Sequence, residues 1–328
     1  MRFGIVGTNF ISDRFVSSAV KTDGAELYGV TSGHYENAAA FAEKYAIPHI
    51  YSSLQEMLSD DQIEAVYLAT PNSMHYEQTL QCIEAGKHVM TEKPFTPAVR
   101  QAEQLFAAAE RKHVYVHDAL VPMYGEGIRV MKQELKRCGR IRRAVFSISQ
   151  YSSRFDAYLE GRNPTTFRRE LCNGAWMDLG VYAISCAAAL FGKPGQILAV
   201  SQLLDTGADV TSSAFLRYEG FDAVITCSKA ALSEMTCEIG GENGTLILDH
   251  PNRTGKVWFT DRRTKEKTLL FEAHQDDFVL QLEDFIENVQ NGRTESERLP
   301  HALTLDIIGI LETCRKQSGV IYPCDEEE

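Results

Sequence analysis

The sequence predicts an α/β protein in which a doubly wound parallel sheet is followed by a second, α+β domain with a large open, mostly antiparallel sheet. Over the first 120 residues, short apolar runs alternate with amphipathic helical patterns, which is typical of a parallel sheet with helices on both faces. Beyond residue 120, several alternating segments follow one another without helices between them. This second pattern indicates antiparallel strands.

In the first domain, apolar runs mark the strands, and a helical pattern follows each of them. The strands are predicted at residues 3–6, 27–30, 65–69, 88–90 and 114–116, and the clearest helices at 36–45, 74–85 and 98–112. Strands that are apolar throughout are buried on both faces. Because 328 residues exceed the usual size of one hydrophobic core, we divide the chain into domains at 1–120 and 121–328.

The second domain begins with a helix at 126–136, a strand near 143–150 and a polar loop, and a helix follows at 175–191. The antiparallel strands are predicted at 197–204, 213–218, 223–228, 235–239, 245–248 and 256–260. Helices at 276–291 and 302–316 end the chain, and the last of these is a candidate to pack back on the first domain.

Charge and cysteine usage exclude several classes of protein. The net charge is −12, and no block of lysine and arginine opposes it, so we expect neither nucleic acid nor a membrane as a partner. Eight cysteines are scattered without a C-x-x-C pair, which favours a reducing compartment and neither disulfides nor a metal site. No signal segment or membrane-spanning run is recognised, and a cytoplasmic location is expected.

The first strand ends in a turn that has the layout of a dinucleotide-binding fingerprint. The turn reads Gly7-Thr8-Asn9-Phe10-Ile11-Ser12, with Asn9 and Ser12 in place of the second and third glycines. A tight turn that feeds a helix N-terminus binds pyrophosphate through backbone N–H groups and the helix dipole. An ordinary strand–helix turn is the alternative.

The end of the second strand bears on the choice between NAD and NADP. Proteins that bind NAD usually place an acidic residue there, which hydrogen-bonds the ribose. Here the strand ends in Ser32-Gly33-His34, without a carboxylate to repel a 2′-phosphate. The sequence therefore leans towards NADP, although no arginine follows Ser32.

Two further strands end in polar residues. The third leads into Thr70-Pro71-Asn72 and then His75, and the fourth into Glu92-Lys93-Pro94. Ligands of open α/β sheets bind beyond the carboxyl ends of the strands, so Lys93 is placed to touch both cofactor and substrate. The alternative is a surface lysine before a turn.

A second group of polar residues lies on the helix predicted at 175–191. Asp178 and Tyr182 are four residues apart, so on a helix they share one face. A carboxylate among apolar neighbours requires a partner, and Lys93 is the natural candidate. The alternative is that Asp178 caps the helix while Tyr182 packs in the core.

Taken in order, the motifs A-T-P-N-x-x-H, E-K-P, G-A-x-x-D-x-G-x-Y and F-G-x-P resemble those of the Gfo/Idh/MocA oxidoreductase family. The resemblance covers nearly the whole chain. It implies a Rossmann domain and a C-terminal domain whose open sheet builds a homodimer or higher homo-oligomer. It also implies that Lys93 and Tyr182 flank the nicotinamide of NADP or NAD, with Asp178 beside the substrate.

The function that we expect is hydride transfer between NAD(P) and a CH–OH or carbonyl carbon of a sugar, cyclic polyol or related diol. Tyr182 acts as general acid/base, with its phenolate favoured by Lys93. The predicted cofactor-binding residues are Gly7, Thr8, Asn9, Phe10, Ile11, Ser32, Thr70, Pro71, Asn72, His75, Glu92 and Lys93. The predicted substrate contacts are Arg154, Arg168, Asn173 and Trp176.

Two alternatives use the same fold. One is a non-catalytic regulator that senses a dinucleotide or a sugar, and the other is an NAD-dependent, redox-assisted glycosidase. Fold alone does not separate them. The presence of Lys93, Asp178 and Tyr182 together favours an enzyme, because a sensor needs no proton donor.

Overall fold

The computed structural model describes residues 1–326 of the chain, which form two compact units. The first, here the N-terminal unit, comprises Met1–Thr96, Arg100–Leu120 and Gln275–His301. The second, the C-terminal unit, comprises Pro97–Val99, Val121–His274 and the chain from Ala302 onward. The segment 275–301, which we assigned to the second domain, therefore belongs to the first unit, and the helix predicted at 302–316 belongs to the second.

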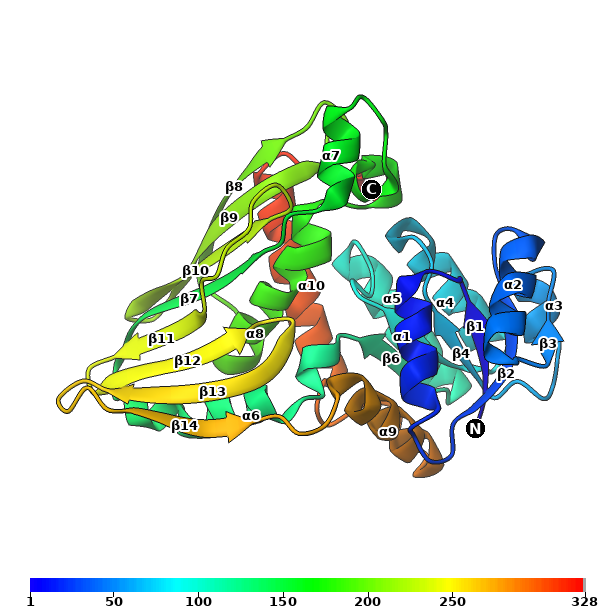
Figure 1. Ribbon diagram of the computed structural model, residues 1–328, viewed down its shortest axis with the longest axis horizontal. Helices are drawn as coiled ribbons and strands as arrows, with labels where there is room; N and C mark the ends of the chain where they lie inside the picture. Colours follow the sequence, from blue (N-terminus) through cyan, green and yellow to red (C-terminus); the bar gives the residue numbers. More distant parts are fainter. Residues whose placement is uncertain (327–328) are drawn as a thin grey trace. The chain divides into compact units, whose positions relative to one another are not determined.

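The N-terminal unit is built on a parallel sheet, as predicted, and the sheet has β3 in addition to the five predicted strands (Figure 1). Its strands are β1 (Arg2–Val6), β2 (Glu26–Thr31), β3 (His49–Ile50), β4 (Ala65–Leu68), β5 (His88–Glu92) and β6 (Val116–Ala119). They lie in the order β3-β2-β1-β4-β5-β6. The direction of winding reverses between β1 and β4, and a doubly wound sheet binds its ligand at that point.

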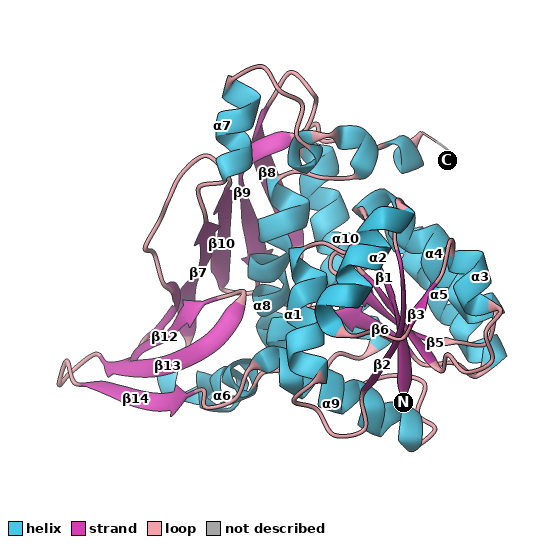
Figure 2. Ribbon diagram, turned by 45° about the vertical axis from the view of Figure 1, so that its right-hand side comes forward, coloured by secondary structure: helices cyan, strands magenta, loops and turns pink. Residues whose placement is uncertain are grey.

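Helices cover both faces of this sheet (Figure 2). They are α1 (Phe10–Ala19), α2 (Tyr35–Tyr45), α3 (Leu54–Leu58), α4 (His75–Glu84), α5 (Val99–Lys112) and α9 (Asp277–Gln290). The α9 helix joins this unit because its apolar face completes the core. Phe285 contacts Phe3 with ring centroids 5.6 Å apart, and Phe15 stacks on Tyr67 at 4.0 Å.

The C-terminal unit is built on an eight-stranded sheet in the order β14-β13-β12-β11-β7-β10-β9-β8. Its strands are β7 (Ile141–Ser149), β8 (Gln196–Leu203), β9 (Asp209–Tyr218), β10 (Phe221–Ser228), β11 (Cys237–Gly241), β12 (Gly244–His250), β13 (Arg253–Asp261) and β14 (Lys267–Glu272). Every neighbouring pair is antiparallel except β7 and β10. The mostly antiparallel sheet that we predicted is thus present, with β14 as an additional strand.

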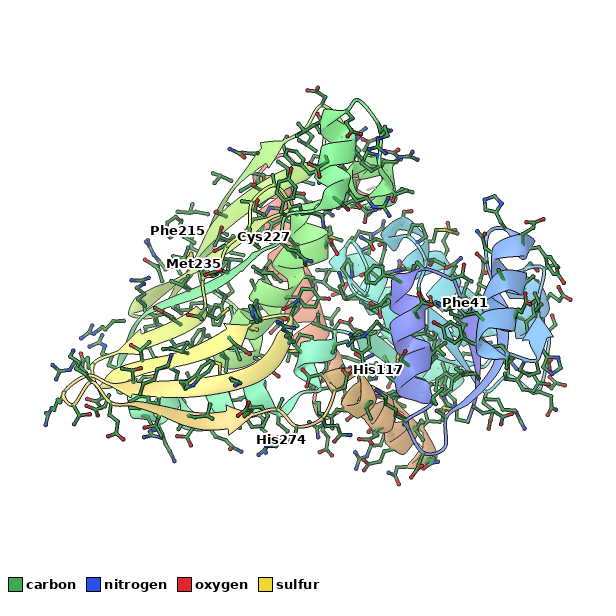
Figure 3. All side chains as sticks on the ribbon, in the orientation of Figure 1. Phe41, His117, Phe215, Cys227, Met235 and His274 are labelled. Atoms are coloured by element: carbon green, nitrogen blue, oxygen red, sulfur yellow. The ribbon has the colours of Figure 1, made fainter. Side chains whose placement is uncertain are left out.

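Helices of the C-terminal unit pack on one face of this sheet (Figure 1). They include α6 (Glu126–Glu134), α8 (Val181–Phe191) and α10 (His301–Gln317), and the short α7 (Ser153–Leu159) follows β7. A π-helical turn, η6 (Trp176–Gly180), leads directly into α8. Along β9 the side chains alternate, since Leu216 is fully buried and Phe215, labelled in Figure 3, is exposed.

One helical stretch corrects a sequence expectation. Residues 169–191 are long and apolar enough to meet the criterion for a membrane span, whereas we expected no such run. In the structure, 78% of the most apolar 18 residues of this stretch are buried inside the protein. Its apolar residues thus serve as the core of the C-terminal unit, where α8 packs on β7 and β10.

Candidate active site

The turn after β1 forms a tight cradle. Gly7 has φ +98°, and a Cβ placed there would lie 2.3 Å from the carbonyl oxygen of Ala69. Asn9 caps α1 by accepting a hydrogen bond from the Ile11 amide at 3.0 Å, and its own side-chain amide donates to the Ala69 carbonyl at 2.8 Å. The Ser12 hydroxyl donates to the Gly7 carbonyl at 2.8 Å. The two departures from the glycine pattern thus hold the turn together.

This cradle fits the pyrophosphate of a dinucleotide. Within the described residues, no hydrogen bond engages the backbone amides of Asn9 and Phe10, and both lie at the positive end of the α1 dipole. Thr8 and Ser32 approach within 3.4 Å between their hydroxyl oxygens, so the ends of β1 and β2 present hydroxyl groups together. The Phe10 ring is 77% exposed beside them.

His75 is a scaffold residue and not a surface group. Its Nδ1 lies 2.9 Å from the carbonyl oxygen of Pro94, its Nε2 lies 2.9 Å from that of Thr70, and the side chain is fully buried. Burial lowers the pKa of His75. The imidazole ties the loop after β4 to the loop after β5, so we correct its predicted direct contact with cofactor to a positioning role.

At the end of β5, a buried carboxyl lies next to the predicted catalytic lysine. Tyr67 donates a hydrogen bond of 2.7 Å to Glu92, and the Lys93 backbone amide donates to the same carboxyl at 3.2 Å. Burial raises the pKa of Glu92 to about 7. The side chain of Lys93 is half-buried.

We expect this buried carboxyl to make stability depend on pH. The pKa of Glu92 is about 7 in the folded chain against an ordinary 4.5, so the folded state binds the proton more tightly. Stability then falls by about 3 kcal/mol as pH rises between these two values. In Glu92→Gln this loss of stability between pH 4.5 and pH 7 should be absent. The free energy of unfolding by urea, measured at pH 5 and pH 8 for both proteins, tests this.

The control for this prediction is Glu84→Gln, which removes an exposed carboxyl that pairs with Lys112 and should keep the wild-type pH dependence. If wild type and Glu92→Gln show the same dependence of stability on pH, the raised pKa of Glu92 is contradicted.

In the C-terminal unit, Asp178 lies on η6 and Tyr182 in the first turn of α8. A buried aspartate holds the start of this segment: Asp209 accepts hydrogen bonds from the Trp176 amide at 2.8 Å and from the Ser212 hydroxyl at 2.6 Å. Gly174 has φ +147°, and a Cβ there would lie 2.0 Å from Asp209 Oδ1. The G-A-x-x-D motif therefore needs its glycine for close packing on Asp209.

Asp178 is half-exposed, and its partner within this unit is Lys229. The Lys229 ammonium forms an ion pair with Asp178 Oδ2, and the two side chains are 7% and 41% exposed. We had expected Asp178 to be buried and had named only Lys93 as its partner. Lys229 follows β10 directly, and no sequence spacing connects it with Asp178, so sequence reasoning missed it.

The predicted substrate contacts divide into two groups. Trp176 is fully buried, and its indole N–H donates to the hydroxyls of Ser201 and Ser318 at 3.0 and 3.2 Å, so we correct its role to core packing. Arg154 is exposed on α7. Arg168 donates to the Asn163 carbonyl at 2.8 Å, and the Asn173 side chain donates to the Thr165 carbonyl at 2.9 Å.

No group of three or more His, Cys, Asp or Glu side chains is placed to hold a metal ion in the described part of the chain, residues 1–326. The polar groups described above are, in the N-terminal unit, the cradle with Glu92 and Lys93 and, in the C-terminal unit, Asp178 and Tyr182.

These features define an oxidoreductase with a dinucleotide-binding Rossmann domain, and comparison with known proteins gives its family. Residues 1–119 match the oxidoreductase family with an NAD-binding Rossmann fold, and residues 133–247 match the Gfo/Idh/MocA C-terminal domain. The chain belongs to the Gfo/Idh/MocA family.

Full-length relatives support this assignment. The chain is 36% identical over 326 residues to scyllo-inositol 2-dehydrogenase (NADP(+)) IolU of Bacillus subtilis, covering 99% of both chains. It is 28% identical to trans-1,2-dihydrobenzene-1,2-diol dehydrogenase of Danio rerio, covering 100% of this chain and 99% of the relative. Among solved structures, the 3-ketoreductase KijD10 of Actinomadura kijaniata shares the fold with a TM-score of 0.85 at 24% identity, covering 97% and 98% of the two chains.

Proposed function

We propose that this oxidoreductase transfers a hydride between NAD(P) and a CH–OH or carbonyl carbon of a cyclic polyol, a sugar or a related diol. The observation that carries the proposal is end-to-end similarity to a scyllo-inositol 2-dehydrogenase, with 99% of both chains covered. The dihydrodiol dehydrogenase relative also acts, by its name, on adjacent hydroxyl-bearing carbons.

The cofactor-binding half of the site is the end of the parallel sheet. The cradle of Gly7, Thr8, Asn9, Phe10 and Ile11 would hold the pyrophosphate. Thr70, Pro71 and Asn72 follow β4, and Glu92 is the last residue of β5; these residues would line the nicotinamide side. When bound, the nicotinamide supplies the acceptor or donor of the hydride.

The catalytic group is Lys93 from the N-terminal unit, with Asp178 and Tyr182 from the C-terminal unit. The Tyr182 phenol moves the hydroxyl proton of the reacting carbon, and a neighbouring ammonium from Lys93 would favour its ionised form at working pH. Asp178 accepts a hydrogen bond from a substrate hydroxyl. Arg154, Arg168 and Asn173 are the remaining candidates for polar contacts with the other hydroxyls.

We propose NADP as the preferred cofactor. No carboxylate stands at residues 32–34, directly after β2, and a Cβ added at Gly33 would meet no atom within 4 Å; this open position supports a 2′-phosphate beyond Ser32. The name of the Bacillus subtilis relative states NADP(+). A dissociation constant for NAD much smaller than that for NADP contradicts this preference.

We propose that the C-terminal sheet forms a homodimer through its uncovered face. Leu198 and Val200 on β8 and Phe215 on β9 are large apolar side chains that are exposed, and Leu198 is the register partner of Phe215. Exposed apolar groups that gather on one face mark an interface. Sedimentation should give a dimer for wild type and a monomer for Val200→Lys/Phe215→Lys; a monomeric wild type contradicts the proposal.

We also propose a cytoplasmic location. All eight cysteines are free thiols, and seven of them are buried, which fits a reducing compartment.

The experiment that tests the function is a panel of inositols, aldoses and diols, each supplied with NADP or NAD and followed at the absorbance of the reduced nicotinamide. We expect turnover with at least one cyclic polyol or sugar. Tight binding of a panel member without any turnover supports the regulator, and glycoside cleavage without net reduction supports the redox-assisted glycosidase.

A further inference from the structure

We propose that Lys229 is the positioning residue for Asp178: it keeps this carboxylate ionised and aims it as an acceptor for a substrate hydroxyl. This inference rests on the proposed function, which gives Asp178 its substrate role, and extends it to a residue outside the family motifs. Lys229 itself acts only through Asp178.

The backbone of Lys229 is fixed on both sides. Its N–H donates to the Val210 carbonyl at 2.9 Å, and its carbonyl accepts from the Ser152 amide at 2.9 Å. The lysine thus continues the hydrogen bonding of β10 beyond Ser228, the last residue of the strand. A side chain that starts from such a rigid base delivers its ammonium to a defined place, which a surface lysine does not.

The burial of the pair is unequal, and this decides what Lys229 can do. The Lys229 side chain is 7% exposed and that of Asp178 is 41% exposed. The Lys229 side chain is thus shielded from solvent, while the Asp178 side chain is partly open to it. A buried ammonium is costly without a partner, so the cation holds the anion in place and the anion meets the ligand.

Other ionisable groups surround the pair on the elements packed against η6. Asp209 lies on β9, Cys227 on β10 and Tyr182 on α8. Asp209 is fully buried and hydrogen-bonded to Trp176 and Ser212, and burial raises the pKa of both Asp209 and Cys227. Lys229 is a cation that forms an ion pair with Asp178, and its removal should leave that carboxylate more readily protonated.

The direct test is a carboxyl NMR titration of protein labelled with ¹³C-aspartate, in which the Asp178 signal is identified by its loss in Asp178→Asn. In Lys229→Met the midpoint for this signal should rise by about one pH unit or more, and in Lys229→Arg it should stay near wild type. The matched control is Lys256→Met, which removes the exposed Lys256–Glu272 pair and should leave the midpoint unchanged.

The kinetic readout is the pH profile of kcat/KM with the best panel substrate. Lys229→Met should lower kcat/KM by about 10-fold at neutral pH and move its acid limb to higher pH. In the Asp178→Asn background the same substitution should have no further effect, because the lysine acts through the carboxylate. Lys229→Arg should recover most of the loss.

A wild-type NMR midpoint in a folded Lys229→Met overturns the inference, as does an equal loss from this substitution with and without Asp178. If Lys229→Met does not fold, Lys229→Gln, which keeps a hydrogen-bond donor and removes the charge, gives the same two readouts. A wild type that turns over no polyol or sugar overturns the proposed function instead, and the NMR titration still decides the role of Lys229.

Discussion

Replacing Tyr182 with phenylalanine should lower kcat by about 10²-fold or more, with the fold and the affinity for NADPH retained. The substitution removes only the phenolic oxygen, the atom that carries the substrate proton in our mechanism, and loss of a general acid/base has this size. Tyr182 is half-buried at the start of α8, so the ring can keep its packing. Stopped-flow turnover with the best panel substrate measures the effect.

Lys93→Met should lower kcat by a similar factor, and the factor by which the double variant lowers kcat should be much smaller than the product of the two single factors. The effects of two residues that serve one proton transfer are non-additive, because removing either residue disables the other. The control is Lys44→Met, which removes an exposed lysine that pairs with Asp13 at 2.9 Å. Near-normal turnover by Tyr182→Phe removes tyrosine from the mechanism.

Gly7→Ala should destabilise the N-terminal unit by about 2–4 kcal/mol and weaken the binding of NADPH. The added Cβ would lie 2.3 Å from the Ala69 carbonyl oxygen at a φ of +98°, so the turn must shift. The same carbonyl accepts the hydrogen bond from Asn9, so the cap of α1 is disturbed too. Urea unfolding and fluorescence titration with NADPH measure the two effects.

The matched control is Gly33→Ala, where the added Cβ meets no atom within 4 Å, and its stability should be near wild type. Wild-type stability and affinity in Gly7→Ala contradict the geometry of the cradle. The clash is with the protein's own backbone, and so Gly7→Val is expected to unfold the turn and not only to block pyrophosphate.

The fold could be predicted because its signals are local. Apolar runs mark β1, β4 and β5, and period-two alternation marks β8 to β10. The strand β3 is only two residues long, too short to leave a pattern. The place of α9 could not be read from the sequence, because it depends on the fit of Phe285 against Phe3, a contact between the two ends of the chain.

Motifs could predict where some polar residues lie, but not how packing surrounds them. The turn after β1 and the positions of Asp178 and Tyr182 at the start of α8 could be predicted from motifs, and the roles of these residues stay predictions. Burial, which the motifs do not reveal, rules out the ligand contacts predicted for His75 and Trp176. Both side chains are fully buried, and protein groups bond the nitrogen atoms of their rings. Lys229 and Asp209 lie far from Asp178 and Gly174 in sequence, and the packing of η6 on β9 and β10 brings them together.

Isotopic labelling tests whether the hydride passes directly from the substrate carbon to the nicotinamide. The wild-type protein is incubated with NADP⁺ and the best panel substrate carrying deuterium at its carbinol carbons, and the mass of the reduced cofactor is measured. We expect one deuterium in each molecule of NADPH formed. Reduced cofactor without deuterium, or no reduction of either NADP⁺ or NAD⁺ by any member of the panel, would contradict it.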